Sequence, residues 1–343
     1  MPALTNREWL LVKRPQGLPQ RSDYEWREGP ARAPGEGEVV VRVLYIAMDP
    51  AIRGWMDPSG NYFTPIPLGS PVTAVVLGPV VESRDPRLPV GTMVCGLGSW
   101  SDYATAPGLF FNPVVDADQH DLVAFLHPLG PVGLTAHYGL FDRAGMKKGD
   151  AVLVSGATGG VGSLVAQMAR LGGASKVVGI AGGPVKCRQA VEVFGYDSCL
   201  DYRAEADLSA AIARELPQGF NVFFENVGGK VLEAALDNMA KNARIAICGM
   251  ISGYNATEKN PGPANLWNLL VKTARLEGFL VADCLGTPEA VEMYRAISRW
   301  LKEGRLRYKV DVRDGLENTP ETFNLLFSGR HDGKLLVKVA NPT

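Results

Sequence analysis

Along the second half of the chain, short apolar runs alternate with segments of helical periodicity. The apolar runs lie at 151–155, 176–180, 198–200, 221–225, 244–248 and 276–281. The helical segments lie at 162–171, 184–194, 204–216, 231–239 and 264–273. This alternation predicts right-handed βαβ units and a six-stranded, doubly wound parallel sheet. The strand interiors carry no charge, as expected of a sheet that is buried on both faces.

The first 126 residues have a different pattern. Apolar runs at 37–46, 72–77, 80–83 and 92–96 are separated by proline and glycine, which is typical of a compact β domain of barrel type. Near the other end, a helix is expected from Glu289 to Lys302, before Gly304. The alternating run Leu335–Val339 predicts a last strand, which could join either domain.

Length and composition narrow the class of protein. A chain of 343 residues favours two domains with separate cores. Its formal net charge of -1 offers no broad attraction to nucleic acid or to an anionic membrane, so a small-molecule partner is expected.

No apolar run reaches the roughly 18 residues that span a bilayer. The first 11 residues lack the apolar core of a signal peptide. The five scattered cysteines have no C-x-x-C spacing, which favours a reducing cytoplasm over a disulfide framework.

The glycine-rich segment Val154–Ser163 is the strongest local signal of chemistry. It follows a predicted strand and opens a predicted helix. Gly156, Gly159 and Gly162 would permit the strand-to-helix turn, the approach of backbone to a pyrophosphate and close packing of the helix on the sheet. Since the spacing is GxxGxxG rather than GxGxxG, its flanking elements carry the prediction of a dinucleotide site.

Residues after the second and third strands favour NADP(H) over NAD(H). The second strand ends Gly179-Ile-Ala-Gly-Gly183, without the acidic residue that binds the adenosine ribose in NAD sites. Lys186 and Arg188 follow where cations could bind a 2′-phosphate, and Tyr202 could join them. The alternative for Lys186 is an ordinary solvated helix residue. Asn226, after the fourth strand, either binds the nicotinamide ribose or only forms a turn.

Four segments of the second half of the chain together resemble a known family. The runs V-S-G-A-T-G-G-V-G-S, V-V-G-I-A-G-G-P-V-K-C, F-F-E-N-V-G-G and C-G-M-I-S-G-Y-N are similar to the zinc-independent medium-chain dehydrogenase/reductases. The closest resemblance is to the branch of NADPH-dependent alkenal double-bond reductases, which includes prostaglandin and curcumin reductases. In the first domain, residues 48–54 are similar to the family's D-P-Y-M-R-G and residues 100–103 to its W-x-E-Y.

The resemblance implies a GroES-like domain from residues 1–126 plus 288–343, a Rossmann NADP-binding domain from residues 127–287, and a homodimer. It also assigns cofactor-binding roles by position, to Gly156, Thr158, Gly159, Gly162, Gly182, Lys186, Tyr202, Asn226, Cys248, Ser252, Tyr254, Phe279, Leu280, Val281 and Gly333.

Three positions depart from the family's pattern. The Tyr of its G-M-P-G-x-T-A-Y is His137, the Asn of its C-terminal N-x-G-K is His331, and the aromatic residue of D-P-Y-M-R is Ala51. These departures bear on the shape of the substrate more than on cofactor binding.

The expected reaction needs no metal. The catalytic Cys, the G-H-E segment and the four-Cys lobe of zinc alcohol dehydrogenases are missing, and the four histidines have no ligand-like spacing with Cys, Asp or Glu. Hydride transfer to the β-carbon of an α,β-unsaturated aldehyde or ketone would leave an enolate, which requires a hydrogen-bond donor at its oxygen. Tyr254 is the candidate for that catalytic role, and the ribose 2′-hydroxyl of the cofactor is the alternative.

The first domain is expected to supply the substrate pocket through Tyr45, Arg53, Tyr62 and Phe63. Phe63 and the nearby Trp55 could instead be core or rim residues, and Arg53 could form a structural ion pair. Two rival functions stay open at this point. One is an NADPH:quinone reductase, and the other is a non-catalytic NADPH-binding or structural protein of the crystallin kind.

Overall fold

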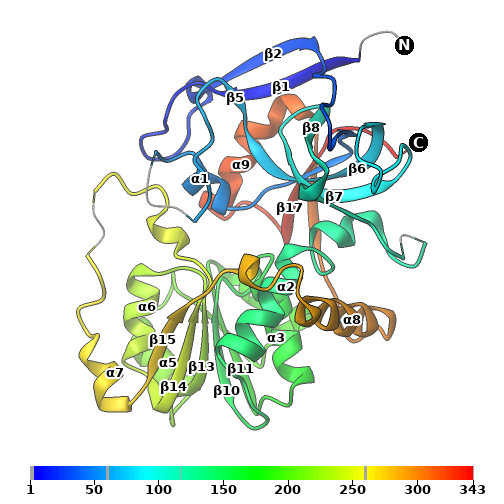
Figure 1. Ribbon diagram of the computed structural model, residues 1–343. Helices are drawn as coiled ribbons and strands as arrows, with labels where there is room; N and C mark the ends of the chain where they lie inside the picture. The colour runs from blue at the N-terminus through cyan, green and yellow to red at the C-terminus, as the bar shows by residue number, and fades with distance from the viewer. Residues whose placement is uncertain (1–3, 59–61, 117, 259–260, 343) are drawn as a thin grey trace. The chain divides into compact units, whose positions relative to one another are not determined.

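The computed structural model describes residues 4–58, 62–116, 118–258 and 261–342 (Figure 1). The chain forms two compact units, residues 1–126 with 310–343 and residues 127–309. No helix within the described ranges is both long enough and apolar enough to cross a membrane.

A six-stranded parallel sheet forms the centre of the second unit, as predicted. Its strands, in chain order, are β10 (Ala151–Ser155), β11 (Lys176–Ala181), β12 (Ser198–Asp201), β13 (Phe220–Glu225), β14 (Met239–Ile247) and β15 (Arg275–Gly278). Their spatial order is β12-β11-β10-β13-β14-β15. Chain order reverses between β10 and β13, and the carboxyl ends of the strands at such a switch point form the ligand-binding edge of a doubly wound sheet.

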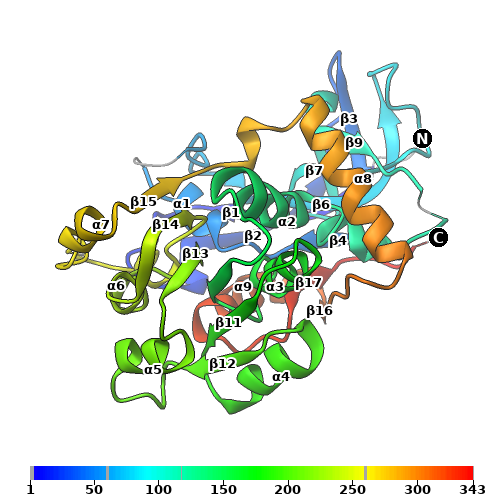
Figure 2. The same ribbon diagram turned by 90° about the horizontal axis from the view of Figure 1, so that it is seen from below.

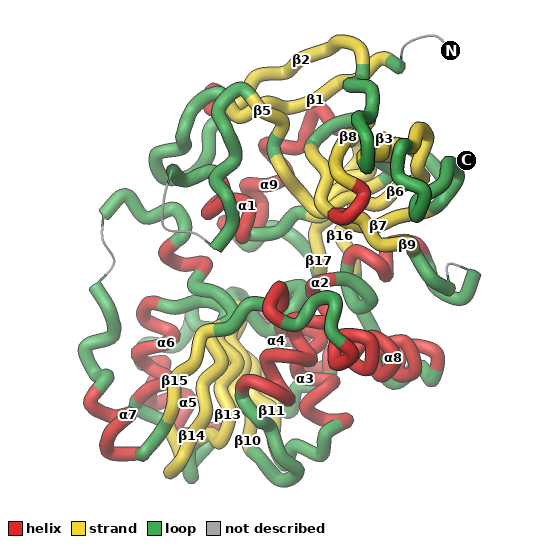
Figure 3. The backbone as a smooth tube through the Cα atoms, in the orientation of Figure 1, coloured by secondary structure: helices red, strands yellow, loops and turns green. Residues whose placement is uncertain are grey.

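Helices run beside these strands (Figure 3). They are α3 (Gly162–Leu171), α4 (Pro184–Phe194), α5 (Leu208–Glu215), α6 (Gly229–Leu236) and α7 (Trp267–Lys272). Leu153, Phe223 and Ile245 on one face of the sheet share a buried cluster with residues of α5 and α6. The expected helix at 231–239 ends earlier, because Met239 already pairs with Phe220 as the start of β14. The expected helix at 264–273 is likewise shorter, since Thr273 adopts the left-handed conformation that ends α7.

The expected boundary at residue 288 is wrong for the helix that follows it. Helix α8 (Pro288–Lys302) belongs to the second unit. Its Ala290 and Met293 are buried with Cys284, against partly buried side chains of α2 (Pro131–His137) and the π-helix Tyr138–Arg143. Beyond α8, the amide side chain of Gln167 exchanges two hydrogen bonds of 2.8 Å with the backbone of Arg307. Helix α8 belongs to the second unit because its apolar face packs against α2, which lies far away in the sequence.

The first unit is a mostly antiparallel β structure, in which only β16 and β17 pair in parallel among the described strands. Its described residues also form the α-helices α1 (Ala51–Trp55) and α9 (Thr319–Ser328). Strands β16-β17-β4-β6-β3-β8 pair in that order, β7 joins β6 to β9, and β2-β1-β5 form a separate sheet. The strands are β1 (Thr5–Leu11), β2 (Tyr24–Pro30), β3 (Glu38–Arg42), β4 (Tyr45–Ala47), β5 (Ser70–Pro71), β6 (Thr73–Ser83), β7 (Met93–Ser99), β8 (Tyr103–Pro107), β9 (Phe111–Pro113), β16 (Val310–Asp314) and β17 (Lys334–Lys338).

Two expected strand limits differ in this unit. The run at 37–46 forms two strands, because Val43 and Leu44 leave the first pairing to bond Asp102 and Leu77. The runs at 72–77 and 80–83 form the single strand β6. Its Gly78 lies so close to the neighbouring backbone that a Cβ atom would be 1.9 Å from the carbonyl oxygen of Arg42.

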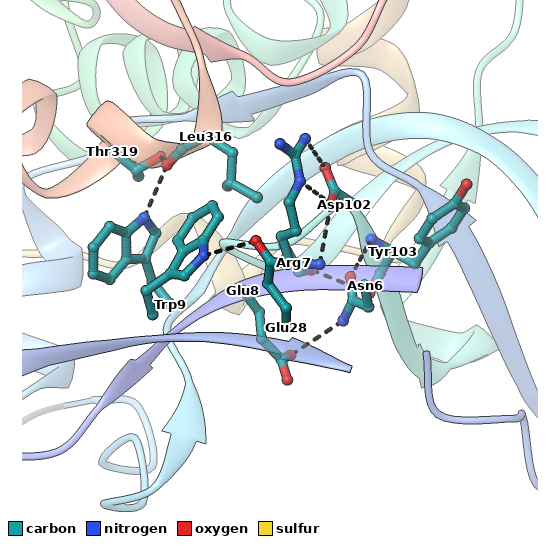
Figure 4. Close-up of polar contacts among 11 residues, drawn as sticks. Asn6, Arg7, Glu8, Trp9, Glu28, Asp102, Tyr103, Leu316 and Thr319 are labelled. Carbon is teal, nitrogen blue, oxygen red and sulfur yellow. Dashed lines mark hydrogen bonds and ion pairs between the residues drawn. The ribbon is translucent and has the colours of Figure 1, made fainter. Parts of the chain in front are cut away.

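Both ends of the chain build the first unit. Strand β17 pairs with β4, so the last strand joins this unit rather than the other. Figure 4 shows two further links from β1: Trp9 Nε1 donates to the carbonyl oxygen of Leu316 at 2.9 Å, and the Arg7 guanidinium binds the carboxylate of Asp102 at 2.7 and 3.0 Å. These contacts hold β1 between the C-terminal segment and the start of β8.

Candidate functional site

The glycine-rich loop between β10 and α3 has little room for side chains. Gly156 has a φ of +62°, the left-handed conformation that makes the turn after β10. A Cβ on Gly162 would lie 2.3 Å from the carbonyl oxygen of Gly156, so only glycine lets α3 begin there. Gly159 closes the turn by donating its amide to the same oxygen at 2.9 Å. This cradle fits a dinucleotide, because backbone can approach a pyrophosphate closely in front of the first amides of a helix.

Two buried side chains hold this loop, and sequence reasoning missed both. His127 Nε2 lies 2.8 Å from the carbonyl oxygen of Gly160, and the Tyr196 hydroxyl donates to that of Gly162 at 2.7 Å. Both carbonyl groups are thereby directed into the protein. No local pattern marks His127 or Tyr196, because each reaches the loop from more than 30 positions away in sequence.

The segments that follow β11 and β12 meet at Gly182. A Cβ there would lie 2.9 Å from the Tyr202 ring and 3.0 Å from Nε of Arg203. The Asp201 carboxylate accepts the amides of Gly183 at 2.8 Å and Arg203 at 3.0 Å, which ties the two segments together. Tyr202 is 43% exposed. Lys186 lies half-buried in the first turn of α4. Arg203, which directly follows Tyr202, is a further cationic side chain at this place, and no local sequence pattern marks it.

Asn226 is fixed between the ends of β10 and β13. Its Nδ2 donates to the carbonyl oxygen of Ser155 at 2.7 Å, and its backbone amide donates to Ser155 Oγ at 2.7 Å. The side-chain amide is therefore oriented, with Oδ1 as the acceptor available to a hydroxyl group. The predicted ribose contact of Asn226 remains a prediction.

Glu225, which precedes Asn226, is fully buried and was not foreseen as a functional residue. One oxygen of its carboxyl group accepts the amides of Val227 and Gly228, and the carboxyl group also interacts with the Ser155 side chain. Burial raises the pKa of Glu225 to about 7, because the cost of removing the carboxylate from water exceeds the gain from these hydrogen bonds.

Glu225→Gln is expected to remove a pH dependence of stability. The carboxyl group has a pKa of about 7 in the folded chain against its ordinary 4.5. Between these values the folded state binds the proton more tightly, so stability falls as the pH rises through this window and is constant above it. The wild type should lose about 1–3 kcal/mol relative to the variant over that range.

Urea denaturation at about pH 5 and about pH 8 measures this effect. The exposed Glu303→Gln is the control, and it should keep the wild-type dependence. If the free energy of unfolding changed with pH equally in the wild type and in Glu225→Gln, the raised pKa would not belong to Glu225.

The loop after β14 adjoins the loop that carries Asn226. Ser252 Oγ donates to the carbonyl oxygen of Val227 at 2.6 Å, and the amide of Ile251 donates to that of Asn226 at 3.2 Å. The Tyr254 hydroxyl accepts the amide of Met250 at 3.3 Å, next to Gly249. Burial raises the pKa of Tyr254 above its ordinary value, so the phenol keeps its proton at neutral pH. Cys248, at the start of this loop, is partly buried, and desolvation raises the pKa of its thiol as well.

The ring of Phe279, after β15, lies in the core of the unit. It packs edge-on against Tyr138 and Phe224, with centroids 5.9 and 6.0 Å apart. Leu280 and Val281 follow as partly buried residues, and Val281 packs against the cluster around Cys284. The second unit thus places its predicted site residues after the carboxyl ends of the parallel strands. They are Gly156, Thr158, Gly159, Gly162, Gly182, Lys186, Tyr202, Asn226, Cys248, Ser252, Tyr254, Phe279, Leu280 and Val281.

The predicted substrate residues all lie in the first unit, and Arg53 has a structural environment there. It is only 3% exposed, and its guanidinium binds the Asp57 carboxylate at 2.6 Å and the carbonyl oxygens of Gly17 and Pro15 at 3.2 Å. These contacts favour the ion-pair alternative.

The other predicted residues of the first unit differ in burial. Phe63 stacks on the buried Trp55 with centroids 4.6 Å apart, as expected of core or rim residues. Tyr45 is half-buried in β4, and Tyr62 is 58% exposed. Gly333, with a φ of +90°, precedes β17.

Metal ligands are not gathered in the described part of the chain, where no group of three or more His, Cys, Asp and Glu side chains is placed to hold an ion.

Two family descriptions match the sequence. One, an N-terminal domain of oxidoreductase, covers residues 7–114, and the other, zinc-binding dehydrogenase, covers residues 160–302.

Similar proteins align along almost the whole chain. The NADPH-dependent curcumin reductase of Escherichia coli is 39% identical over 98% of this chain and 97% of its own length. The NADP(+)-dependent 2-alkenal reductase of Nicotiana tabacum is 39% identical over 98% of both chains. The crystal structure of CurA from Vibrio vulnificus in complex with NADPH covers 98% of this chain and all of its own, with 33% identity and a TM-score of 0.91.

These matches cover both predicted domains, so the GroES-like and Rossmann assignments are confirmed. Together with the glycine cradle and the parallel sheet, they identify the family. The chain belongs to the medium-chain dehydrogenase/reductases, in the branch of the curcumin, alkenal and prostaglandin reductases.

Proposed function

We propose that this protein reduces the carbon–carbon double bond of α,β-unsaturated aldehydes and ketones with NADPH. The observation that carries the proposal is Tyr254, a protonated phenol next to the Asn226 loop at the ligand-binding edge of the sheet. The coarser statement, that the chain is an NADP-dependent oxidoreductase, follows from its family and its relatives.

The chemistry of such a substrate explains why a phenol is needed. Bound NADPH supplies the hydride that the β-carbon of the substrate accepts. Negative charge then moves through the conjugated system to the carbonyl oxygen, where a donor must stabilise it. The Tyr254 hydroxyl already accepts the amide of Met250, so its own proton can point outward toward that oxygen. A partly buried donor is effective because a lower local dielectric strengthens its interaction with the developing charge.

Tyr254→Phe is expected to lower kcat with an enone by about tenfold or more, equivalent to at least 1.4 kcal/mol of transition-state stabilisation. The ring and its packing stay, and only the donor is lost. Steady-state kinetics with saturating NADPH measures the effect. Tyr103→Phe, a tyrosine of strand β8 in the first unit, is the matched control. An unchanged kcat in Tyr254→Phe would assign the donor to the ribose 2′-hydroxyl instead.

A substrate panel tests the reaction class. NADPH oxidation with 2-alkenals, cyclic enones and benzoquinones should be fastest with the first two, and the products should be saturated aldehydes or ketones. Turnover of quinones alone would support the quinone-reductase alternative. NADPH binding without turnover on the whole panel would support the non-catalytic one.

We also propose that the protein is a homodimer that joins through the edge strand β15. This strand pairs only with β14 among the described strands, and its Arg275 and Leu276 are exposed. Nearby α7 exposes Trp267 at 69% and Leu270 at 66%, which is apolar surface that a second copy would cover. A second β15 can extend the sheet by edge-to-edge pairing.

Light scattering during gel filtration is expected to give the mass of two chains, while Trp267→Glu with Leu270→Glu should give one. Glu substitutions at exposed Leu109 and Val115 of the first unit are the control, and they should leave the dimer intact. A monomeric wild type would contradict the proposal.

A cytoplasmic location is proposed as well, and only the five free thiols support it.

A further inference from the structure

Two cysteines that the proposed reaction does not use lie next to the predicted 2′-phosphate site. Cys187 is in the first turn of α4, and its amide donates to the carbonyl oxygen of Gly183. Cys199 is in β12, opposite Gly179 of β11. Helix α4 lies along β12 (Figure 2). Both side chains are partly exposed.

The two thiols lie on the same side of the sheet, the side that α4 covers. Leu200 points to the opposite side, where it is buried with Ala211 and Ile212 of α5. Since side chains alternate along a strand, its neighbour Cys199 points toward α4. There its thiol lies close enough to that of Cys187 for the two groups to interact.

This contact makes the two thiols chemically different. The neighbouring Cys199 thiol lowers the pKa of Cys187, and the neighbouring Cys187 raises the pKa of Cys199. The position of Cys187 in the first helical turn favours its thiolate further. Cys187 is therefore the nucleophile of the pair and Cys199 the thiol that keeps its proton.

We propose that Cys187 and Cys199 form a reversible disulfide when the protein meets a peroxide, and that this disulfide weakens NADPH binding. The Cys187 thiolate attacks one peroxide oxygen, the O–O bond breaks, and the departing oxygen leaves as hydroxide or alkoxide. The Cys187 sulfenic acid then reacts with the Cys199 thiol, which forms the S–S bond and releases water. The two sulfur atoms lose two electrons, and the peroxide gains them.

The link to NADPH rests on the proposed placement of the 2′-phosphate at Lys186 and Tyr202. Lys186 directly precedes Cys187, and Gly183 at the start of α4 is tied to Asp201 of β12. A new S–S bond shortens the distance between the two sulfur atoms and draws the first turn of α4 toward β12. Lys186 moves with that turn.

The experiment treats the reduced full-length protein with a small excess of hydrogen peroxide and compares it with Cys187→Ser, Cys199→Ser and Cys95→Ser. Cys95 is a thiol of the first unit and serves as the control. Non-reducing peptide mapping should find tryptic peptides 187–188 and 189–203 joined. Fluorescence titration should show that the NADPH dissociation constant rises at least about tenfold, the loss of one charge-assisted contact, and recovers with dithiothreitol.

The wild type and Cys95→Ser should give both results, and the other two variants neither. Sulfenic or sulfinic acid at Cys187 without the joined peptides would overturn the disulfide. A disulfide with unchanged NADPH affinity would overturn its regulatory effect. If the reduced wild type does not prefer NADPH over NADH, the proposed phosphate site fails instead, and peptide mapping still decides the disulfide.

Discussion

Gly162→Ala is expected to lower kcat/KM for NADPH by about 100-fold or more, equivalent to roughly 2.7 kcal/mol. The added Cβ would lie 2.3 Å from the carbonyl oxygen of Gly156 and 3.0 Å from its carbonyl carbon. Both atoms are backbone, so no side-chain rotation relieves the contact and the loop itself must move. The first amides of α3 then point away from the position that a pyrophosphate requires.

Fluorescence titration of NADPH and steady-state kinetics measure this loss, and thermal unfolding separates it from a global loss of structure. Gly29→Ala is the control, because nothing lies within 4 Å of the added Cβ there. If Gly162→Ala bound NADPH as tightly as the wild type, the loop between β10 and α3 would not be the phosphate cradle.

Lys186→Ala is expected to weaken NADPH binding roughly 10- to 100-fold, as the loss of a charge-assisted hydrogen bond to a phosphate implies, with little change for NADH. Lys186 lies in the first turn of α4, shortly after Gly182, around which Tyr202 and Arg203 gather. Only the coenzyme with a 2′-phosphate places a negative charge there. The ratio of dissociation constants for NADPH and NADH is therefore the decisive measurement.

Lys147→Ala controls for the loss of one positive charge. Lys147 is exposed before the start of β10, at the amino edge of the sheet, so both coenzymes should bind that variant normally. Lys186→Arg should retain much of the NADPH preference. An equal loss with both coenzymes in Lys186→Ala would contradict the phosphate assignment.

Local sequence signals predicted the second unit better than the first. Uncharged strands between amphipathic helices are marked by short-range periodicity, so the order of elements from β10 to β15 was predictable. Errors occurred where long-range pairing overrides local preference, as at Met239, which pairs with Phe220 instead of extending α6. The first unit depends on such pairings almost throughout. Strands β1 and β2 were not predicted, and β1 is held by Trp9 and Arg7 through contacts with Leu316 and Asp102.

Within the candidate site, the glycines were the residues that the sequence predicted best. Backbone geometry requires glycine at 156 and 162, and the spacing of glycines in the sequence therefore indicates the loop. Arg53 illustrates the opposite case. A basic residue after Asp49-Pro50 is compatible with a substrate contact or an ion pair, and only the position of Asp57 and of the Pro15 and Gly17 carbonyl groups distinguishes them.

By itself, the sequence determined the two-domain class, the parallel sheet and the NADP(H) cofactor, and it predicted the phosphate loop, because each depends on neighbours within a few residues or on one missing carboxylate. Only the tertiary structure decided that α8 belongs with α2, that Glu225 is buried with a raised pKa, and that the thiols of Cys187 and Cys199 meet. The reason is physical. Burial, pKa and reactivity depend on which distant segments exclude water from a group, and this information is not present in local sequence.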